Sequence, residues 1–229
     1  MISPARIETN MSGPSLPSRR GEKSSLTFTY PIGPSLYVNV TNRCNADCIF
    51  CDRKGAATVH GYSLKMARGE EPEAGVYIQE IGDPRQYSGI VFCGYGEPTI
   101  RWEVVKQVAR HVKQQGGFTR MNTNGHGNVI NHRDITPELA GVIDTVSISL
   151  NSTEAGQYAA LMRVAPSLHA EMLQFARQVK AFTRVVMSVV GIPSVDVAAA
   201  RQFVTDEIGV TFREREYLGA ESDVPSGPF

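Results

Sequence analysis

Short runs rich in β-forming residues alternate with helical stretches, and this alternation is the feature that most constrains the fold. The runs cover residues 35–40, 89–93, 119–123, 145–150, 184–190 and 211–217. In three of the intervening stretches, residues 101–115, 170–182 and 197–208, apolar side chains recur at the spacing of an amphipathic helix. Strands that alternate with helices are typical of βα units in a parallel sheet. The sequence therefore predicts an α/β protein, with either a flat doubly wound sheet or a sheet curled into an incomplete barrel.

Length and composition allow one sizeable domain. The chain has 229 residues, of which 41% are hydrophobic, so it can bury a core. We expect the domain at residues 29–219. Residues 1–28 and 220–229 are rich in Ser, Pro and Gly without apolar periodicity, which is typical of disordered tails.

Charge and hydropathy exclude some classes of partner. The 23 basic and 23 acidic residues give a net charge of zero, which argues against a nucleic-acid-binding protein. No apolar run approaches the ~20 residues of a membrane span, and no signal peptide opens the chain. We therefore predict a cytoplasmic protein with no membrane partner, in a compartment that keeps thiols reduced.

Three of the four cysteines lie within eight residues. Cys44, Cys48 and Cys51 have the spacing C-x3-C-x2-C. Structural zinc sites use four ligands, commonly as two separated pairs, and no second pair is present. Three thiolates on a [4Fe–4S] cluster leave its fourth iron open to a ligand, which favours a catalytic iron–sulfur cluster. The fourth cysteine, Cys93, lies in an apolar run, where we expect a small buried hydrophobic side chain.

Polar residues and glycines follow most of the predicted strands. In parallel α/β folds, binding sites gather at the carboxyl ends of the strands, and the cysteine segment follows the first run directly. The other candidates at these ends are Gly94, Tyr95, Gly96, Glu97, Asn122, Asn124, Ser147, Ser149, Asn151, Ser188, Arg213 and Arg215. His126 and His132 flank the third strand and are candidate proton donors.

Each of these candidates also has a purely structural interpretation. Glu97 can be a surface residue in a strand-to-helix turn, and the pair Asn124–Gly125 is an ordinary turn signal. Ser147 and Ser149 alternate with apolar residues, which also fits a half-exposed edge strand. Arg215 can bind a carboxylate or phosphate, or it can form ion pairs on a solvated edge strand.

The pattern C-x3-C-x-Phe-C, with Phe50 before the last cysteine, resembles the signature of the radical S-adenosylmethionine (SAM) superfamily. The segment from Gly94 to Pro98 is similar to the Gly-Gly-Glu-Pro motif of that family, although Tyr95 separates the two glycines. This resemblance implies a partial (β/α)6 barrel with a [4Fe–4S] cluster and SAM as cofactors. Reductive cleavage of SAM would then give a 5′-deoxyadenosyl radical that abstracts hydrogen from a substrate.

The resemblance also implies roles for the candidate residues. Cys44, Cys48 and Cys51 would bind the cluster, and the backbone of residues 94–96 with Glu97 would meet the SAM ammonium group. Phe50 would pack over the cluster or the adenine. The other implied cofactor contacts are Asn122, Asn124, Ser147, Ser149, Asn151, Ser188 and Arg215.

Across residues 35–217 the motifs are most similar to the radical SAM proteins found beside TatD-family nucleases, whose substrate the sequence does not identify. A flavodoxin or ferredoxin would supply the electron, and the substrate would be small or presented by a partner. Other hypotheses remain open. They are a 7-carboxy-7-deazaguanine synthase-like or glycyl-radical-activase-like enzyme, a non-catalytic iron–sulfur protein, and a zinc-binding interaction module.

Overall fold

A computed structural model describes residues 27–51 and 57–217. The predicted tails, residues 1–28 and 220–229, lie outside the described residues except for residues 27 and 28, and residues 52–56, 218 and 219 of the predicted domain also lie outside them. None of the described helices is both long enough and apolar enough to cross a membrane.

The main sheet has seven strands in the order β1-β2-β5-β6-β7-β8-β9. Strand β1 pairs antiparallel with β2, and the other neighbours are parallel. The two outer strands, β1 and β9, do not pair with each other, so the sheet is an open, partial barrel. The strands are β1 (Thr29–Ile32), β2 (Ser35–Asn39), β5 (Gly89–Cys93), β6 (Thr119–Thr123), β7 (Thr145–Ser149), β8 (Arg184–Val190) and β9 (Thr211–Arg215).

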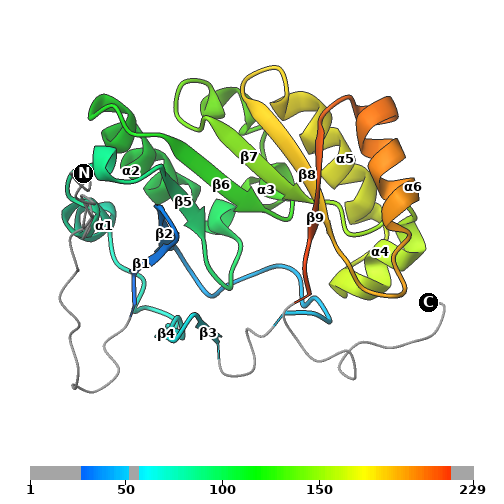
Figure 1. Cartoon of the computed structure of the whole chain (residues 1–229), viewed down its shortest axis with the longest axis horizontal. Helices are drawn as coiled ribbons and strands as arrows, with labels where there is room; N and C mark the ends of the chain where they lie inside the picture. The colour runs from blue at the N-terminus through cyan, green and yellow to red at the C-terminus, as the bar shows by residue number, and fades with distance from the viewer. Residues whose placement is uncertain (1–26, 52–56, 218–229) are drawn as a thin grey trace, which may run out of the picture.

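The helices follow the strands across the molecule, from α1 beside β1 and β2 to α6 beside β9 (Figure 1). They are α1 (Ala74–Ile81), α2 (Trp102–Gln114), α3 (Gly127–Asn131), α4 (Ala155–Met162), α5 (Ser167–Val179) and α6 (Val197–Gln202). Short 3-10 helices lie at η2 (Pro84–Gln86), η3 (Pro98–Arg101) and η4 (Thr136–Leu139), and a π-helical segment, η5 (Phe203–Ile208), continues α6. A small hairpin of β3 (Thr58–Val59) and β4 (Tyr62–Ser63) forms a separate two-stranded sheet.

The six predicted strands are confirmed to within two residues at their ends, and the predicted α/β class and partial barrel are confirmed with them. The sequence did not predict β1, the hairpin, or helices α1, α3 and α4. The predicted helix over 197–208 changes to π-helical geometry at Phe203. Residues 136–139 form a single 3-10 turn, with Pro137 in its first turn.

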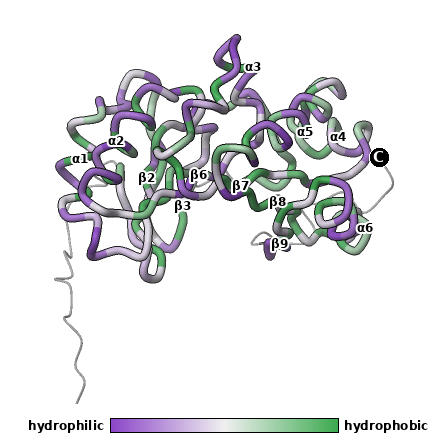
Figure 2. The backbone as a smooth tube through the Cα atoms, turned by 90° about the horizontal axis from the view of Figure 1, so that it is seen from above, coloured by the Kyte–Doolittle hydropathy of each residue, from purple (hydrophilic) through white to green (hydrophobic). Residues whose placement is uncertain are grey.

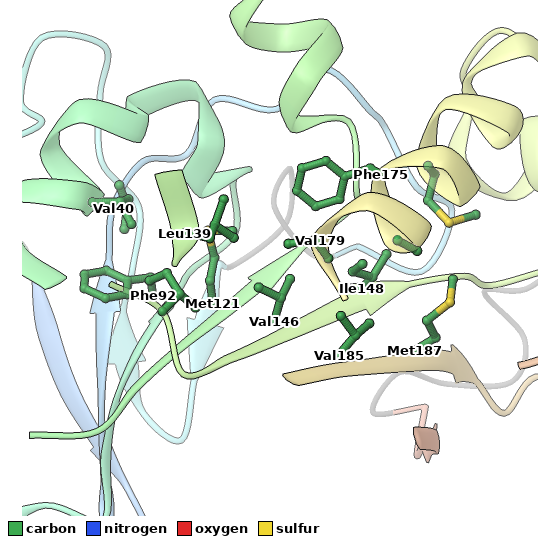
Figure 3. Packing of buried hydrophobic residues seen from close by; sticks show 14 of the residues in the cluster. Val40, Phe92, Met121, Leu139, Val146, Ile148, Phe175, Val179, Val185 and Met187 are labelled. Carbon is green, nitrogen blue, oxygen red and sulfur yellow. The ribbon is translucent and has the colours of Figure 1, made fainter. Parts of the chain in front are cut away.

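Alternate strand residues pack against the helices and form the core. The helices cover the strand residues Phe92, Met121 and Val146, which are buried. On the helix side, α5 contributes Phe175 and Val179 to the same core (Figure 3). Apolar stretches accordingly lie along β8, while a hydrophilic stretch lies at α3 (Figure 2). The remaining alternate residues face the opposite surface of the curved sheet, which we call the inner face.

The inner face is polar. On β6 it carries Arg120 and Asn122, and on β7 it carries Ser147 and Ser149, all of them half-buried. A sheet covered only by apolar layers would have apolar residues on both faces. Polar side chains on the inner face therefore mark the surface where a ligand can bind.

Candidate functional site

The cysteine loop directly follows β2 at the carboxyl end of the sheet. On one side, its backbone bonds to the end of α4, because Asp47 N donates to Met162 O (3.0 Å) and Ile49 N donates to Leu161 O (2.9 Å). The Cys48 thiol lies 3.4 Å from Met162 Sδ. These contacts with α4, which is far along the chain, therefore hold the cysteine loop at the mouth of the barrel.

The turn after β5 holds the other side of the loop. Glu97 N donates to Arg43 O at 2.9 Å, and a Cβ atom built on Gly96 would approach Arg43 O to 2.5 Å and Thr41 O still more closely. Gly94 has a φ of 138°, and a Cβ there would lie 2.5 Å from Asn39 Oδ1. The two glycines therefore allow the turn to pack directly on the backbone of the cysteine loop.

The Glu97 carboxylate lies inside the protein, with the residue only 2% exposed. Its Oε1 accepts hydrogen bonds from Thr99 N (3.1 Å), Thr99 Oγ1 (2.7 Å) and Thr123 Oγ1 (2.7 Å), and its Oε2 accepts one from Asn124 N (2.8 Å). Burial raises the pKa of Glu97, while these four hydrogen bonds act to lower it. In this arrangement Glu97 joins the ends of β5 and β6, and its expected contact with the SAM ammonium group stays a prediction.

A chain of hydrogen bonds connects the cysteine loop to the end of β6 and to α4. Asn124 Nδ2 donates to Asn45 Oδ1 (2.8 Å), and Asn45 Nδ2 then donates to His126 Nδ1 (2.9 Å). His126 Nε2 is left to donate to Tyr158 Oη at 2.8 Å. Burial lowers the pKa of His126 to about 4, so its imidazole is neutral at neutral pH.

Of the two histidines predicted as proton donors, His126 is fully buried and acts within this network, whereas His132 is exposed at the end of α3. Asn124 also directs Nδ2 at Cys44 Sγ, at 3.9 Å. The structure thus brings Asn124 beside a cysteine, and its expected contact with the cofactor stays a prediction.

The predicted residues on β7 and β9 come together at the inner face. Arg215 Nη2 donates to Ser149 Oγ (3.3 Å) and to Asn151 Oδ1 (3.1 Å). Burial lowers the pKa of Arg215, and the Cys93 and Cys48 thiols lie close enough to act on it in the opposite direction. The alternative of a solvated edge-strand arginine is therefore wrong for Arg215, although Arg213 is exposed.

The other predicted residues occupy varied positions. Ser147 is half-buried on the inner face, while Ser188 is buried and donates to Ile148 O at 3.4 Å. Phe50 is half-buried and packs against the core. Tyr95 is half-buried, and its hydroxyl donates to Thr58 O of the β3–β4 hairpin at 2.8 Å.

The expectation that Cys93 packs as a small buried hydrophobic residue is wrong. Cys93 is half-buried, and Asn122 Nδ2 donates to its Sγ at 3.3 Å. The reason is that successive side chains of a β-strand point to opposite faces of the sheet. Ile90 and Phe92 face the helices, so Cys93 faces inward although its run is apolar.

Three residues at this face, Tyr37, Asn39 and Arg120, were not predicted from the sequence. Asn39 is buried with an unbonded Oδ1. Arg120 on β6 donates a hydrogen bond to the hydroxyl of Tyr37 on β2. The period of two along each strand would have found them, since Asn122 is two residues from Arg120 on β6.

The donor set fits an iron–sulfur cluster. Cys44 Sγ accepts from Ala46 N at 3.4 Å as well as from Asn124, and hydrogen bonds of this kind stabilise a thiolate ligand. Within the described residues the side chains do not converge as ligands for one metal ion. A [4Fe–4S] cluster does not require ligands that converge on one ion, because each of its cysteines binds a different iron.

Comparisons with known proteins agree with this fit. A family model for the Radical SAM superfamily matches residues 38–205. No curated protein matches the sequence.

Several solved structures share the fold. One is TYW1 with a lysine–pyruvate adduct bound, at a TM-score of 0.59 and 13% identity over 82% of this chain and 66% of that one. Another is Streptococcus suis SuiB bound to S-adenosylmethionine, at 0.60 and 15% over 82% of this chain and 41% of that one. A third is anSMEcpe with bound AdoMet, at 0.53 and 13% over 80% and 50%. The chain thus spans less than two thirds of the length of each of these structures.

The family match covers most of the chain and includes the cysteine loop, the turn after β5 and the polar ends of β6 and β7. This chain therefore belongs to the radical SAM superfamily.

Proposed function

We propose that the chain cleaves S-adenosylmethionine reductively and uses the radical to take a hydrogen atom from a substrate at the inner face of the sheet. The bound cofactors supply the radical chemistry, since an electron from the cluster splits SAM into methionine and a 5′-deoxyadenosyl radical. The observation that carries the proposal is the position of Cys44, Cys48 and Cys51, which are held at the carboxyl end of β2 beside a polar inner face.

In this proposal the three cysteines bind three irons and leave the fourth for SAM. The hydrogen bond from Asn124 and the backbone of Ala46 support the Cys44 thiolate. Glu97 fixes the turn of residues 94–96 against the cysteine loop, so that the backbone at this turn can meet the methionyl end of SAM.

The remaining cofactor contacts lie across the inner face. Arg215 would bind the SAM carboxylate, because its guanidinium is buried and hydrogen-bonds only to neutral oxygens among the described residues. Ser147 and Ser149, half-buried on the inner face, would bond the ribose hydroxyls, and Phe50 would pack against the adenine. Asn122 and Ser188 would complete the wall around the nucleoside.

The finer assignments come from the sequence motifs. They support a member of the branch found beside TatD-family nucleases, with a flavodoxin or ferredoxin as electron donor and a small or partner-presented substrate in the cytoplasm. The absence of a basic surplus in the sequence supports a substrate other than nucleic acid.

The test is anaerobic purification, reconstitution with iron and sulfide, and reduction with dithionite in the presence of SAM. We expect four irons per chain, a broad absorption at about 400 nm, and release of 5′-deoxyadenosine. Cys48→Ala should abolish that release, because a ligand thiol is lost. Cys93→Ser is the matched control, since it alters the only cysteine outside the loop and should retain the four irons.

Other results would point to the competing functions. A cluster that forms without any deoxyadenosine would indicate a non-catalytic iron–sulfur protein. A colourless protein that binds zinc would indicate an interaction module. Undiminished deoxyadenosine from Cys48→Ala would reject the ligand assignment itself.

A further inference from the structure

The structure points to an anion-binding subsite around Arg120, and we propose that this subsite takes a carboxylate or phosphate group of the substrate. Arg120 lies on β6, four residues before Asn124, which contacts the cysteine loop. Four strand residues span about 13 Å, so the subsite lies deeper along the inner face than the cysteines. The proposal rests on the proposed function, since it names the class of substrate for the same site.

The guanidinium of Arg120 is positioned but incompletely bonded. Its Nη2 donates to Tyr37 Oη at 2.9 Å, and its central carbon lies 5.9 Å from the centre of the Tyr37 ring. Its Nε is buried without a hydrogen-bond partner. Buried donors are nearly always bonded in native proteins, so an unbonded one indicates a ligand or water.

No described carboxylate neutralises this charge. Strands β2, β5, β6, β7 and β8 contain no Asp or Glu within their bounds. The single acid on β9, Glu214, points away from the inner face and lies beside Gly191. Among the described residues Arg120 and Arg215 form no ion pair, and a partly buried cation without a counter-charge is costly. The inner face is therefore electrostatically suited to an anion.

Unbonded buried polar atoms gather on the same face. Of the six such side-chain atoms among the described residues, four belong to Asn39, Arg120, Asn122 and Arg215. Asn122 follows Arg120 by two residues, which is about 7 Å along the strand, and its unbonded atom is the acceptor Oδ1. The subsite is thus complementary to a molecule that carries an anion and, about 7 Å away, a hydroxyl or amino donor.

SAM also carries a carboxylate, so the experiment must separate the two sources. The reconstituted protein, with SAM bound and no reductant, is titrated by calorimetry with 4-hydroxybenzoate, 4-hydroxyphenyl phosphate and the uncharged 4-hydroxybenzamide. We expect saturable binding of at least one of the two anions at one per chain, and at least tenfold weaker binding of the amide. The preferred anion distinguishes a carboxylate subsite from a phosphate subsite.

Arg120→Gln should weaken binding of the preferred anion at least tenfold and change the Kd of SAM less than about twofold, since hydrogen bonds to charged groups are stronger than those between neutral groups. Arg120→Lys keeps the charge and should bind within about fivefold of the unaltered protein, which a misfolded site could not do. Arg110→Gln, an exposed position on α2, is the matched control and should bind normally.

Equal binding of the amide, no binding of either anion, or unchanged anion binding by Arg120→Gln would overturn the proposal. A loss of SAM affinity in Arg120→Gln, with anion binding retained, would overturn it too, because Arg120 would then hold the cofactor. Failure of the proposed function has a separate readout. It would appear as absent deoxyadenosine in a protein that still binds the anion.

Discussion

His126 shows how a single buried side chain can fix the geometry of the cysteine loop. Asn45 follows Cys44 directly in the sequence, and it donates to His126 Nδ1, which can accept only while the imidazole is neutral. Tyr158 occupies the other ring nitrogen. Protonation would place two donors face to face between Asn45 and His126, so the network requires a neutral histidine.

This requirement predicts a dependence of stability on pH. Burial lowers the pKa of His126 from 6.5 to about 4, so between these values the unfolded chain binds a proton that the folded chain does not. The folded state should therefore lose about 3 kcal/mol of unfolding free energy as pH falls through that window, at about 1.4 kcal/mol per pH unit. Urea unfolding at several pH values between 7 and 4 measures it.

His126→Gln cannot titrate and serves as the comparison. We expect it to be less stable than the unaltered protein at pH 7, and we expect the difference to shrink as the pH approaches 4. His169 has a pKa lowered by burial in the same direction, but it is present in both proteins and cancels. Parallel pH profiles for the two proteins would contradict a neutral His126.

At the scale of elements, the site depends on how closely the turn after β5 packs on the cysteine loop. A Cβ on Gly96 would meet the backbone oxygens of Thr41 and Arg43, and backbone atoms cannot move aside as the end of a side chain can. The hydrogen bond from Glu97 N to Arg43 O would be strained by the same displacement.

We therefore predict that Gly96→Ala lowers the iron content after reconstitution and lowers the unfolding free energy by about 1–3 kcal/mol, as overpacking typically does. Gly156→Ala is the control, because nothing lies within 4 Å of a Cβ built at that helical position. Iron analysis and thermal unfolding of both variants make the comparison. Full cluster loading in Gly96→Ala would show that the turn and the loop can separate without consequence.

At the scale of the molecule, one hydrophobic cluster connects the elements. It extends from Leu36 on β2 to Ile208 at the end of η5 and includes residues from every strand between β2 and β8 in the main sheet. A single continuous core is typical of a single cooperative domain.

The composition of the two ends predicts that they add little to this domain. A chain spanning residues 27–219, which keeps the hydrogen bonds of Thr27 and Phe28 to Asn39, should unfold in one transition, within a few degrees of the complete chain, and should release deoxyadenosine at a similar rate. Calorimetry and the SAM cleavage assay check this. A large fall in the transition temperature would show that the terminal segments belong to the folded domain.

Local patterns in the sequence were sufficient for much of the fold. The strands were predictable because β-forming residues are contiguous along the chain, and the helices over 101–115 and 170–182 because their apolar residues repeat every three or four positions. The segment β1 was missed because Thr29–Ile32 is short and interrupted by Pro31, and its pairing with β2 is decided by contact rather than by propensity.

The sequence by itself determined the spacing of Cys44, Cys48 and Cys51, on which the proposed cluster site rests, because these residues are neighbours along the chain. The tertiary structure alone decided what surrounds these residues. Asn45 meets His126 across 81 positions, and Glu97 meets Thr123 across 26. Such pairs form only when the strands pair in parallel, because parallel pairing brings the carboxyl ends of separate strands to one edge of the sheet.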